Sequence, residues 1–192
     1  MLYLNQLDYR HIHYEHNLDN GGVAPERRNV ATSGCGLCCV CMVVAHLTGE
    51  SLSVEDCVQM AVECGANRKI GTRMPLLGTA AAQRFGLAYR ATDSLDEMLA
   101  HLAAGGEVIV NVGGDHDGHI GLFSHVGHYI LAVGQENGEL RILDPAYEEG
   151  RYEEESRRGK VRAEYPFAFC KPEELAADTT NKPTPYHLFS RG

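Results

Sequence analysis

The sequence lacks any cluster of lysine and arginine residues interleaved with aromatic side chains. It has 17 basic residues against 26 acidic ones, and its formal net charge is −9. A nucleic-acid backbone would therefore find no positive surface to bind. No apolar run is long enough to cross a bilayer, and the run from Val108 to Val112 is far too short. We therefore expect neither a nucleic acid nor a membrane as a partner.

The chain also lacks tracts rich in serine or glutamine, internal repeats, and a linker that would divide it into domains. At 192 residues, with 44% hydrophobic and 22% charged residues, it has the size and composition of an ordinary globular protein. We predict a single domain over residues 1–192. Nothing in the sequence indicates an oligomeric state.

The sequence also lacks the cysteine pattern of a disulfide-rich secreted protein. The seven cysteines are odd in number, and four of them lie within seven residues: Cys35, Cys38, Cys39 and Cys41. The first residues also lack the basic segment and apolar core of an export signal. We therefore expect reduced thiols and a cytoplasmic location.

The first half of the sequence carries a series of helix signals. An apolar run of helical length, residues 35–48, ends at Gly49 and predicts a helix that is buried on all sides. Ser53 and Ser94 each precede acidic residues, as N-caps do, and predict helices to about residues 63 and 104. Residues 73–85 predict another helix.

The residues before this helical series are less regular. We expect a short strand over residues 2–4, followed by an irregular arm to residue 33 that is rich in His, Asn, Asp and Gly.

The second half changes to the pattern of β-strands. Apolar and β-branched runs over residues 107–112, 128–134 and 139–144 predict three strands. Asn137 and Gly138 lie between the last two runs and predict a tight hairpin. Helices followed by an antiparallel sheet predict an α+β fold.

After this hairpin the chain becomes strongly charged over residues 148–162, and we expect that segment to be solvated. A strand over residues 165–169, a capped helix from residue 171 and a last strand over residues 186–189 complete the prediction.

Cys35 is the best candidate for a nucleophile. It begins the apolar helix, where unsatisfied N–H groups and the positive end of the helix dipole stabilise a thiolate. Glycines on both sides, Gly34 and Gly36, leave room for a substrate backbone and for N–H groups directed at an oxyanion. We interpret the cysteines further along the helix as packing residues.

A thiol nucleophile needs a base, and His128 opens a predicted strand directly after a glycine. His125, three residues earlier, is its nearest rival. Asp144 ends the strand after the hairpin, so counting from Asn137 places it near the same open end as His128. Asp144 therefore suits the role of a group that orients the imidazole, although an Asp-Pro turn is the simpler alternative.

Three segments resemble a known family. The sequences Thr-Ser-Gly-Cys-Gly at residues 32–36, Gly-His-Tyr-Ile-Leu-Ala-Val-Gly at 127–134 and Ile-Leu-Asp-Pro-Ala at 142–146 follow in the family's order. They resemble the cysteine peptidase-like domains related to bacteriocin-processing, double-glycine leader peptidases of the papain-like superfamily. The resemblance extends over about residues 3–147.

This resemblance implies a papain-like fold, in which a nucleophile-bearing central helix packs on an antiparallel sheet, and it places Cys35, His128 and Asp144 at the triad positions. It also implies an oxyanion-binding glutamine upstream of the cysteine. Gln6 is the candidate. Because 29 residues separate it from Cys35, which is long for the family, Asn29 is kept as a substitute. The implied activity is that of a thiol hydrolase, which cleaves a peptide or small amide substrate through a Cys35 acyl-enzyme and requires no cofactor.

Two alternatives stay open. Cys35, Cys38 and Cys41 have a spacing found in metal and cluster sites, and the histidines between residues 116 and 128 offer a second set of ligands. The chain would then be a metal- or cluster-binding protein. The other alternative is a non-catalytic binding module, or an acyltransferase, on the same fold. We also expect the glycine-rich loop over residues 113–127 to border the cleft as a mobile rim.

Overall fold

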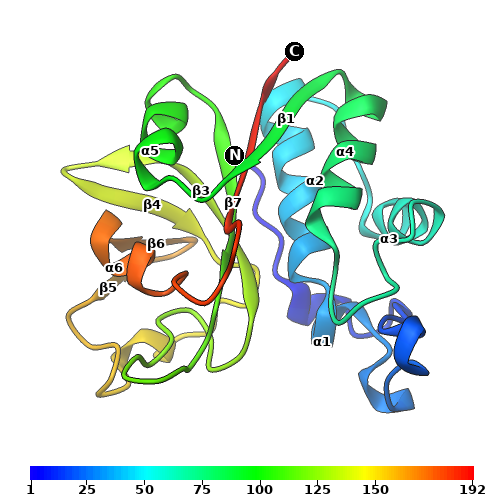
Figure 1. Ribbon diagram of the computed structural model, residues 1–192, viewed down its shortest axis with the longest axis horizontal. Coiled ribbons are helices and arrows are strands. Elements are labelled where there is room, and N and C mark those ends of the chain that lie inside the picture. The colour runs from blue at the N-terminus through cyan, green and yellow to red at the C-terminus, as the bar shows by residue number, and fades with distance from the viewer. The chain divides into compact units, whose positions relative to one another are not determined.

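The computed structural model describes residues 1–192, and the chain divides into two compact units (Figure 1). Unit 1 comprises Met1–Tyr89 and Phe189–Gly192, and unit 2 comprises Arg90–Leu188. The single domain expected from the sequence stays a prediction.

Unit 1 is built from helices, which Figure 1 shows from blue to green. They are the 3-10 helices η1 (Gln6–Tyr9), η2 (Leu18–Asn20) and η3 (Pro25–Arg27), and the α-helices α1 (Val30–Ser33), α2 (Cys35–Thr48), α3 (Val54–Glu63) and α4 (Met74–Phe85).

Helix α2 is the central helix of unit 1. Every residue from Leu37 to Val44 is fully buried, and the helix ends at Gly49, which has a φ of 78°. This positive φ explains the glycine, because other residues rarely adopt it. The helix predicted over residues 35–48 is therefore confirmed. The next helix is confirmed with its cap, since the Ser53 side chain accepts a hydrogen bond from the Asp56 N–H.

The first residues do not form the predicted strand. The Leu2 carbonyl oxygen lies 2.7 Å from the His46 Nε2 atom, and the Leu4 N–H donates to the Met42 Sδ atom over 3.4 Å. The segment finds its partners on side chains of α2 instead of on another strand. The prediction was wrong because alternating apolar residues suit any extended segment that lies against a core.

The arm that follows, which was expected to be irregular, contains the 3-10 helices η1 to η3 and the four-residue helix α1, and it is fixed to unit 1. The Tyr14 hydroxyl lies 2.9 Å from the Thr72 hydroxyl, and the Asn17 N–H donates to the Asn67 carbonyl over 2.9 Å. The buried His16 ring reaches the hydroxyl of Ser33 over 3.2 Å. The arm before Cys35 is thus part of the packing of unit 1.

The strands form one seven-stranded sheet in the order β1-β7-β2-β3-β4-β6-β5. Helices and sheet together confirm the α+β fold. The strands are β1 (Leu87–Thr92), β2 (Glu107–Val112), β3 (His128–Glu136), β4 (Glu139–Leu143), β5 (Val161–Glu164), β6 (Phe167–Cys170) and β7 (Tyr186–Arg191). Strands β1 and β5 were not predicted, because both expose at least half of their residues and carry charged side chains.

Strands β3 and β4 form the predicted hairpin. Its two turn residues have positive φ angles, 52° at Asn137 and 81° at Gly138, as a tight two-residue turn requires. The register shifts between Ala132 and Gly134, where β3 contains a bulge. The hairpin carries the two predicted polar site residues of unit 2 at its open end.

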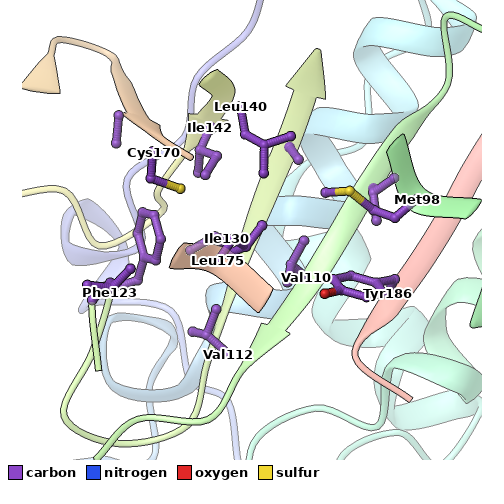
Figure 2. Packing of buried hydrophobic residues seen from close by; sticks show 14 of the residues in the cluster. Met98, Val110, Val112, Phe123, Ile130, Leu140, Ile142, Cys170, Leu175 and Tyr186 are labelled. Atoms are coloured by element: carbon purple, nitrogen blue, oxygen red, sulfur yellow. The ribbon is translucent and has the colours of Figure 1, made fainter. Parts of the chain in front are cut away.

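One apolar core fills unit 2 (Figure 2). Helices α5 (Leu95–Ala103) and α6 (Pro172–Ala177) supply Met98 and Leu175, which pack with the sheet residues Val110 and Ile130. Two connecting segments also contribute to this core. They supply three residues, namely Leu122, Phe123 and Tyr152.

The charged segment over residues 148–162 is therefore not simply solvated, as the sequence suggested. Tyr152 is 4% exposed and Arg157 2% exposed. Arg157 donates from Nε to the Gly121 carbonyl over 3.0 Å, so its charged end is held by the backbone of another loop. A buried arginine that binds backbone carbonyls cannot be told from a solvated one by charge pattern alone.

The helices are all too short or too polar to span a bilayer.

Candidate functional site

Cys35 occupies the first position of α2, as predicted. The first turn of this helix carries no acidic side chain, and the first residues of an α-helix have N–H groups without an intrahelical acceptor. The thiol is partly exposed. The position at the helix start thus favours a thiolate at this residue, and no acidic side chain of the first turn opposes it.

Gly34 joins α1 to α2 by a close backbone contact. Its N–H donates to the Val30 carbonyl oxygen over 2.7 Å, and a β-carbon at Gly34 would overlap the Val30 Cγ1 atom. No other residue fits this joint without displacing the backbone. The glycine before Cys35 therefore has a packing role, besides the open space that the sequence analysis assigned to it.

The neighbouring cysteines in α2 have a different environment. Burial, followed by the negative charges of nearby thiolates, raises the pKa of Cys38 well above its ordinary value. The pKa of Cys41 is also raised, first by its hydrogen bond with Cys57 and then by burial. Both are fully buried, in agreement with their interpretation as packing residues.

Cys64 is the second partly exposed cysteine, and it offers a direct contrast. It lies at the C-cap of α3, where the carbonyl groups of the helix end disfavour a negative charge. Burial raises its pKa above the ordinary value for a thiol. The two partly exposed thiols thus lie at opposite ends of their helices, and only Cys35 lies at an N-terminal end, which stabilises a thiolate.

Gln6 and Asn29 both lie next to α1, and their side-chain amides are used differently. The Gln6 side chain is 6% exposed, and its Nε2 atom donates to the Ala31 carbonyl over 2.7 Å. An amide nitrogen carries two hydrogens, so this bond uses one of them. The Gln6 Oε1 atom is buried and has no hydrogen-bond partner.

Asn29 is instead committed to a helix cap. Its Oδ1 atom accepts from the N–H and the hydroxyl of Thr32, each over 3.1 Å, and its Nδ2 atom donates to the Glu26 carbonyl. Loss of these bonds would uncap α1. Of the two candidates, Gln6 has the amide that is better suited to bind an oxyanion.

His128 and Asp144 lie together in unit 2. The His128 Nε2 atom is 2.7 Å from the Asp144 Oδ1 atom, and both residues are buried. Leu131 pairs with Leu143, so Asp144 follows at the position opposite Ile130. Residues two apart on a strand share a face, which makes His128 and Asp144 diagonal neighbours. The hairpin therefore explains their contact.

Asp144 is fully buried, yet its carboxylate is well satisfied. Besides His128, its Oδ1 atom accepts from the Ala146 N–H over 2.8 Å, and its Oδ2 atom accepts from the Tyr152 hydroxyl over 2.5 Å. The pKa of Asp144 is held below its ordinary value of 3.8: burial alone would raise it, but the charge and hydrogen bond of His128, with Arg151 and Tyr152, outweigh this effect. Asp144 is therefore ionised, and His128 Nε2 must donate.

His125, the rival base, has other partners. Its Nδ1 atom lies 3.0 Å from the Asp115 Oδ2 atom and its Nε2 atom 3.3 Å from the Glu154 Oε2 atom, and the side chain is exposed. Both of its nitrogens thus face surface carboxylates. Of these two candidates, only His128 has a buried carboxylate partner, which is the arrangement that an oriented base requires.

The histidine-rich loop is held by polar contacts. His119 Nε2 lies 2.7 Å from the buried Asp178 Oδ1 atom, and His116 Nε2 lies 2.9 Å from the Thr180 hydroxyl. Arg151 donates to the Phe123 carbonyl over 2.6 Å. These contacts, with Leu122 and Phe123 buried in the core, do not support the expected mobility of this loop.

Neither set of metal ligands considered in the sequence analysis is assembled in the structure. No group of three or more histidine, cysteine, aspartate or glutamate side chains is arranged to hold a metal ion. In α2, Cys38 and Cys41 are fully buried, while Cys35 is partly exposed.

Tyr152 and Arg151 were not recognised from the sequence. Both lie in the charged segment after Asp144, where a tyrosine among glutamates gives no signal of a buried contact. A tyrosine eight residues after a candidate Asp would have been a weak indication at best.

Comparison with known proteins identifies the fold. No protein-family model matches the sequence, and no curated protein matches it significantly. Among solved structures, the peptidase domain of Streptococcus ComA, a bifunctional ABC transporter involved in a quorum-sensing pathway, is 16% identical. It gives a TM-score of 0.56 and covers 84% of this chain and 93% of its own.

Two further structures are similar. A protein from Bacillus anthracis described as a C39-like peptidase is 12% identical with a TM-score of 0.56, and the match covers 83% of this chain and 90% of that one. A double-glycine-motif protease of an AMS/PCAT transporter, solved in complex with the leader peptide, is 18% identical with a TM-score of 0.50, over 82% and 84% of the two chains. This chain therefore has the papain-like α+β fold of C39-like, double-glycine peptidase domains.

Proposed function

We propose that the chain is a thiol hydrolase that cleaves a peptide or related amide bond through an acyl-enzyme on Cys35. The observation that carries this proposal is the buried hydrogen bond of 2.7 Å between His128 Nε2 and Asp144 Oδ1. It occurs on a fold shared with peptidase domains, in a chain whose accessible Cys35 begins a helix. The desolvation of a buried His–Asp pair can offset its attraction, so stability alone gives little reason for such a pair, whereas orienting a base gives one.

In the proposed first step, His128 takes the proton of the Cys35 thiol. Because Nε2 donates to Asp144, the base is the other ring nitrogen, Nδ1. The thiolate attacks the carbonyl carbon, and the carbonyl oxygen becomes an oxyanion. The Cys35 N–H and the second amide hydrogen of Gln6 stabilise that oxyanion.

In the steps that follow, the imidazolium of His128 gives its proton to the leaving amine, and the C–N bond breaks. A thioester with Cys35 remains. Water then attacks the carbonyl carbon of this thioester while His128 accepts a proton from the water. The C–S bond breaks, the acid is released, and the proton on His128 returns to the Cys35 thiolate. No step needs a cofactor or a metal.

We propose a peptide as the substrate class, because one of the similar structures holds a leader peptide. We also propose a reducing, cytoplasmic environment, in which the seven free cysteines would stay reduced. A set of short amide substrates, with and without a Gly-Gly pair before the cleaved bond, tests this class. Turnover that requires Cys35 supports it, and no turnover of any peptide in the set contradicts it.

Selective alkylation tests the nucleophile without a known substrate. We expect iodoacetamide at neutral pH to label Cys35 at least about tenfold faster than Cys64, since only the thiolate reacts and Cys64 has a raised pKa. Peptide mass spectrometry over time gives both rates in one sample. Similar, slow labelling of the two residues would contradict the proposal.

A further inference from the structure

Asp144 is held by more than its contact with His128. A carboxylate that accepts one hydrogen bond can rotate about its Cβ–Cγ bond and offer either oxygen. Here the Tyr152 hydroxyl donates to Oδ2 over 2.5 Å, while the Ala146 N–H and His128 share Oδ1. The two oxygens therefore have different partners, and this fixes which one faces the imidazole.

The Tyr152 hydroxyl is itself placed by rigid surroundings. The residue belongs to η4 (Arg151–Glu153) and is 4% exposed. Its ring packs edge-on against Phe123 at a centroid distance of 5.9 Å and against Tyr147 at 6.0 Å. These aromatic contacts leave the ring little freedom, so the hydroxyl can act as a fixed donor.

Arg151, next to Tyr152, fixes the backbone around Asp144. Its guanidinium donates to the carbonyl oxygen of Ala146, the residue whose N–H binds Asp144, and to that of Phe123, whose ring packs on Tyr152. The segment that carries Tyr152 is thereby tied on both sides to the end of the β3–β4 hairpin. The contact of Tyr152 with Asp144 is part of a connected polar network.

We infer that Tyr152 is a positioning residue of this site: its hydroxyl holds the Asp144 carboxylate so that Oδ1 accepts the His128 Nε2 proton, which directs Nδ1 to the reaction. The inference rests on the function proposed above. Tyr152 touches neither the substrate nor the reacting atoms. It acts through Asp144, as groups behind an orienting carboxylate do in sites held to sub-ångström precision.

Replacement of the hydroxyl alone tests this role. Tyr152→Phe keeps the packed ring, and Tyr165→Phe is the matched control because Tyr165 is 70% exposed. For Tyr152→Phe we expect the alkylation rate of Cys35 to fall roughly fivefold to fiftyfold. The dependence of that rate on pH should also change. Tyr165→Phe should keep the wild-type rate and profile. In an Asp144→Ala background, Tyr152→Phe should have no further effect, because the group that Tyr152 holds is gone.

The His128 Nε2 proton gives a second readout that does not depend on Cys35. In the wild type, the hydrogen bond to Asp144 should protect this proton from exchange with water, so that it gives a resolved NMR signal. Tyr152→Phe should speed its exchange at least about tenfold, while Tyr165→Phe leaves it unchanged. If Tyr152→Phe does not fold at 25 °C, Tyr152→His, which keeps a ring with an N–H donor, is measured instead and should retain part of the protection.

The two readouts separate failure of this inference from failure of the proposed function. Equal labelling of Cys35 and Cys64 in the wild type would overturn the proposed function, and the exchange of the His128 proton would still decide the role of Tyr152. Selective labelling that is the same, within about twofold, in wild type and Tyr152→Phe, with unchanged proton exchange, would overturn the positioning role. A loss of thermal stability without either change would show that Tyr152 is merely structural, and would also overturn it.

Discussion

At the scale of single residues, what separates Cys35 from the other six cysteines is its place in the fold. All seven are chemically the same, and the helix start and the flanking glycines were visible in the sequence. The contrast with Cys64 was not visible in the sequence, because the exposure of a thiol and the end of the helix on which it lies depend on tertiary structure. In the same way, Asp144 was found by counting from a hairpin turn, whereas Tyr152 was missed.

Replacement of the nucleophile gives the first prediction. Cys35→Ser should abolish turnover of any peptide substrate, with a loss of at least about a thousandfold, because a hydroxyl in this environment is not ionised. Cys64→Ser is the matched control and should keep the wild-type rate. The measurement is the initial rate of amide cleavage. Comparable activity of both variants would exclude Cys35 as the nucleophile.

The second prediction concerns Asp144 and acid. Its folded pKa lies below 3.8, so the carboxylate contributes stability above that pH, and this contribution is lost as the pH falls through the folded pKa. Asp144→Asn, which cannot ionise, should therefore weaken the dependence of stability on pH below about pH 4. Urea unfolding at several acidic pH values measures this.

Asp144→Ala should lower the free energy of unfolding more than Asp144→Asn does, at any pH. It removes the acceptor for His128, Ala146 and Tyr152 together, and each buried donor left without a partner costs about 1–3 kcal/mol. Asn retains an acceptor oxygen for the imidazole. Equal stability of the Ala and Asn variants would contradict the contacts assigned to this carboxylate.

At the scale of elements, the helices and the hairpin were predictable because local chemistry marks their ends. Serine caps at Ser53 and Ser94, the stop at Gly49 and the Asn137-Gly138 turn all appear in the structure where the sequence placed them. Strands β1 and β5 escaped prediction because their pairing, not their composition, makes them strands. The interaction of Arg157 with the Gly121 carbonyl joins segments 36 residues apart, which no local pattern records.

The joint between α1 and α2 gives the third prediction. Gly34→Ala should lower the free energy of unfolding by roughly 1–3 kcal/mol, because a β-carbon would overlap the Val30 side chain and carbonyl. It should also slow the labelling of Cys35, since relief of the overlap must shift the start of α2. Thermal unfolding and alkylation measure the two effects. A variant as stable and as reactive as the wild type would show that the joint is not tightly packed.

Strand β7 gives the fourth prediction. Burial lowers the pKa of His187 from 6.5 to about 4. Between these values the unfolded chain binds the proton and the folded chain does not, so stability must fall as the pH falls below 6.5. The expected loss between pH 7 and pH 5.5 is about 1 kcal/mol.

Urea unfolding at the two pH values tests this loss. His187→Gln should remove most of it, while His13→Gln, at an exposed position, should not. A pH dependence that is the same in His187→Gln and in wild type would assign the effect to another group.

At the scale of the whole molecule, the proposed reaction draws on both units. Cys35 and Gln6 belong to unit 1, and His128 and Asp144 belong to unit 2. Cys35 begins helix α2 and His128 begins strand β3, and structures with 12–18% identity share this fold. The central claim is that Cys35 and His128 act on one carbonyl group.

A cross-linking reagent tests that claim most directly. 1,3-Dibromoacetone alkylates a reactive thiolate first and then a nucleophile within a few ångströms of it. It should join Cys35 to His128, which mass spectrometry would detect as one linked pair of peptides. In His128→Gln, Cys35 should be alkylated but not linked. A link from Cys35 to His125 or another residue, or no link at all in the wild type, would rule out His128 as the partner of Cys35.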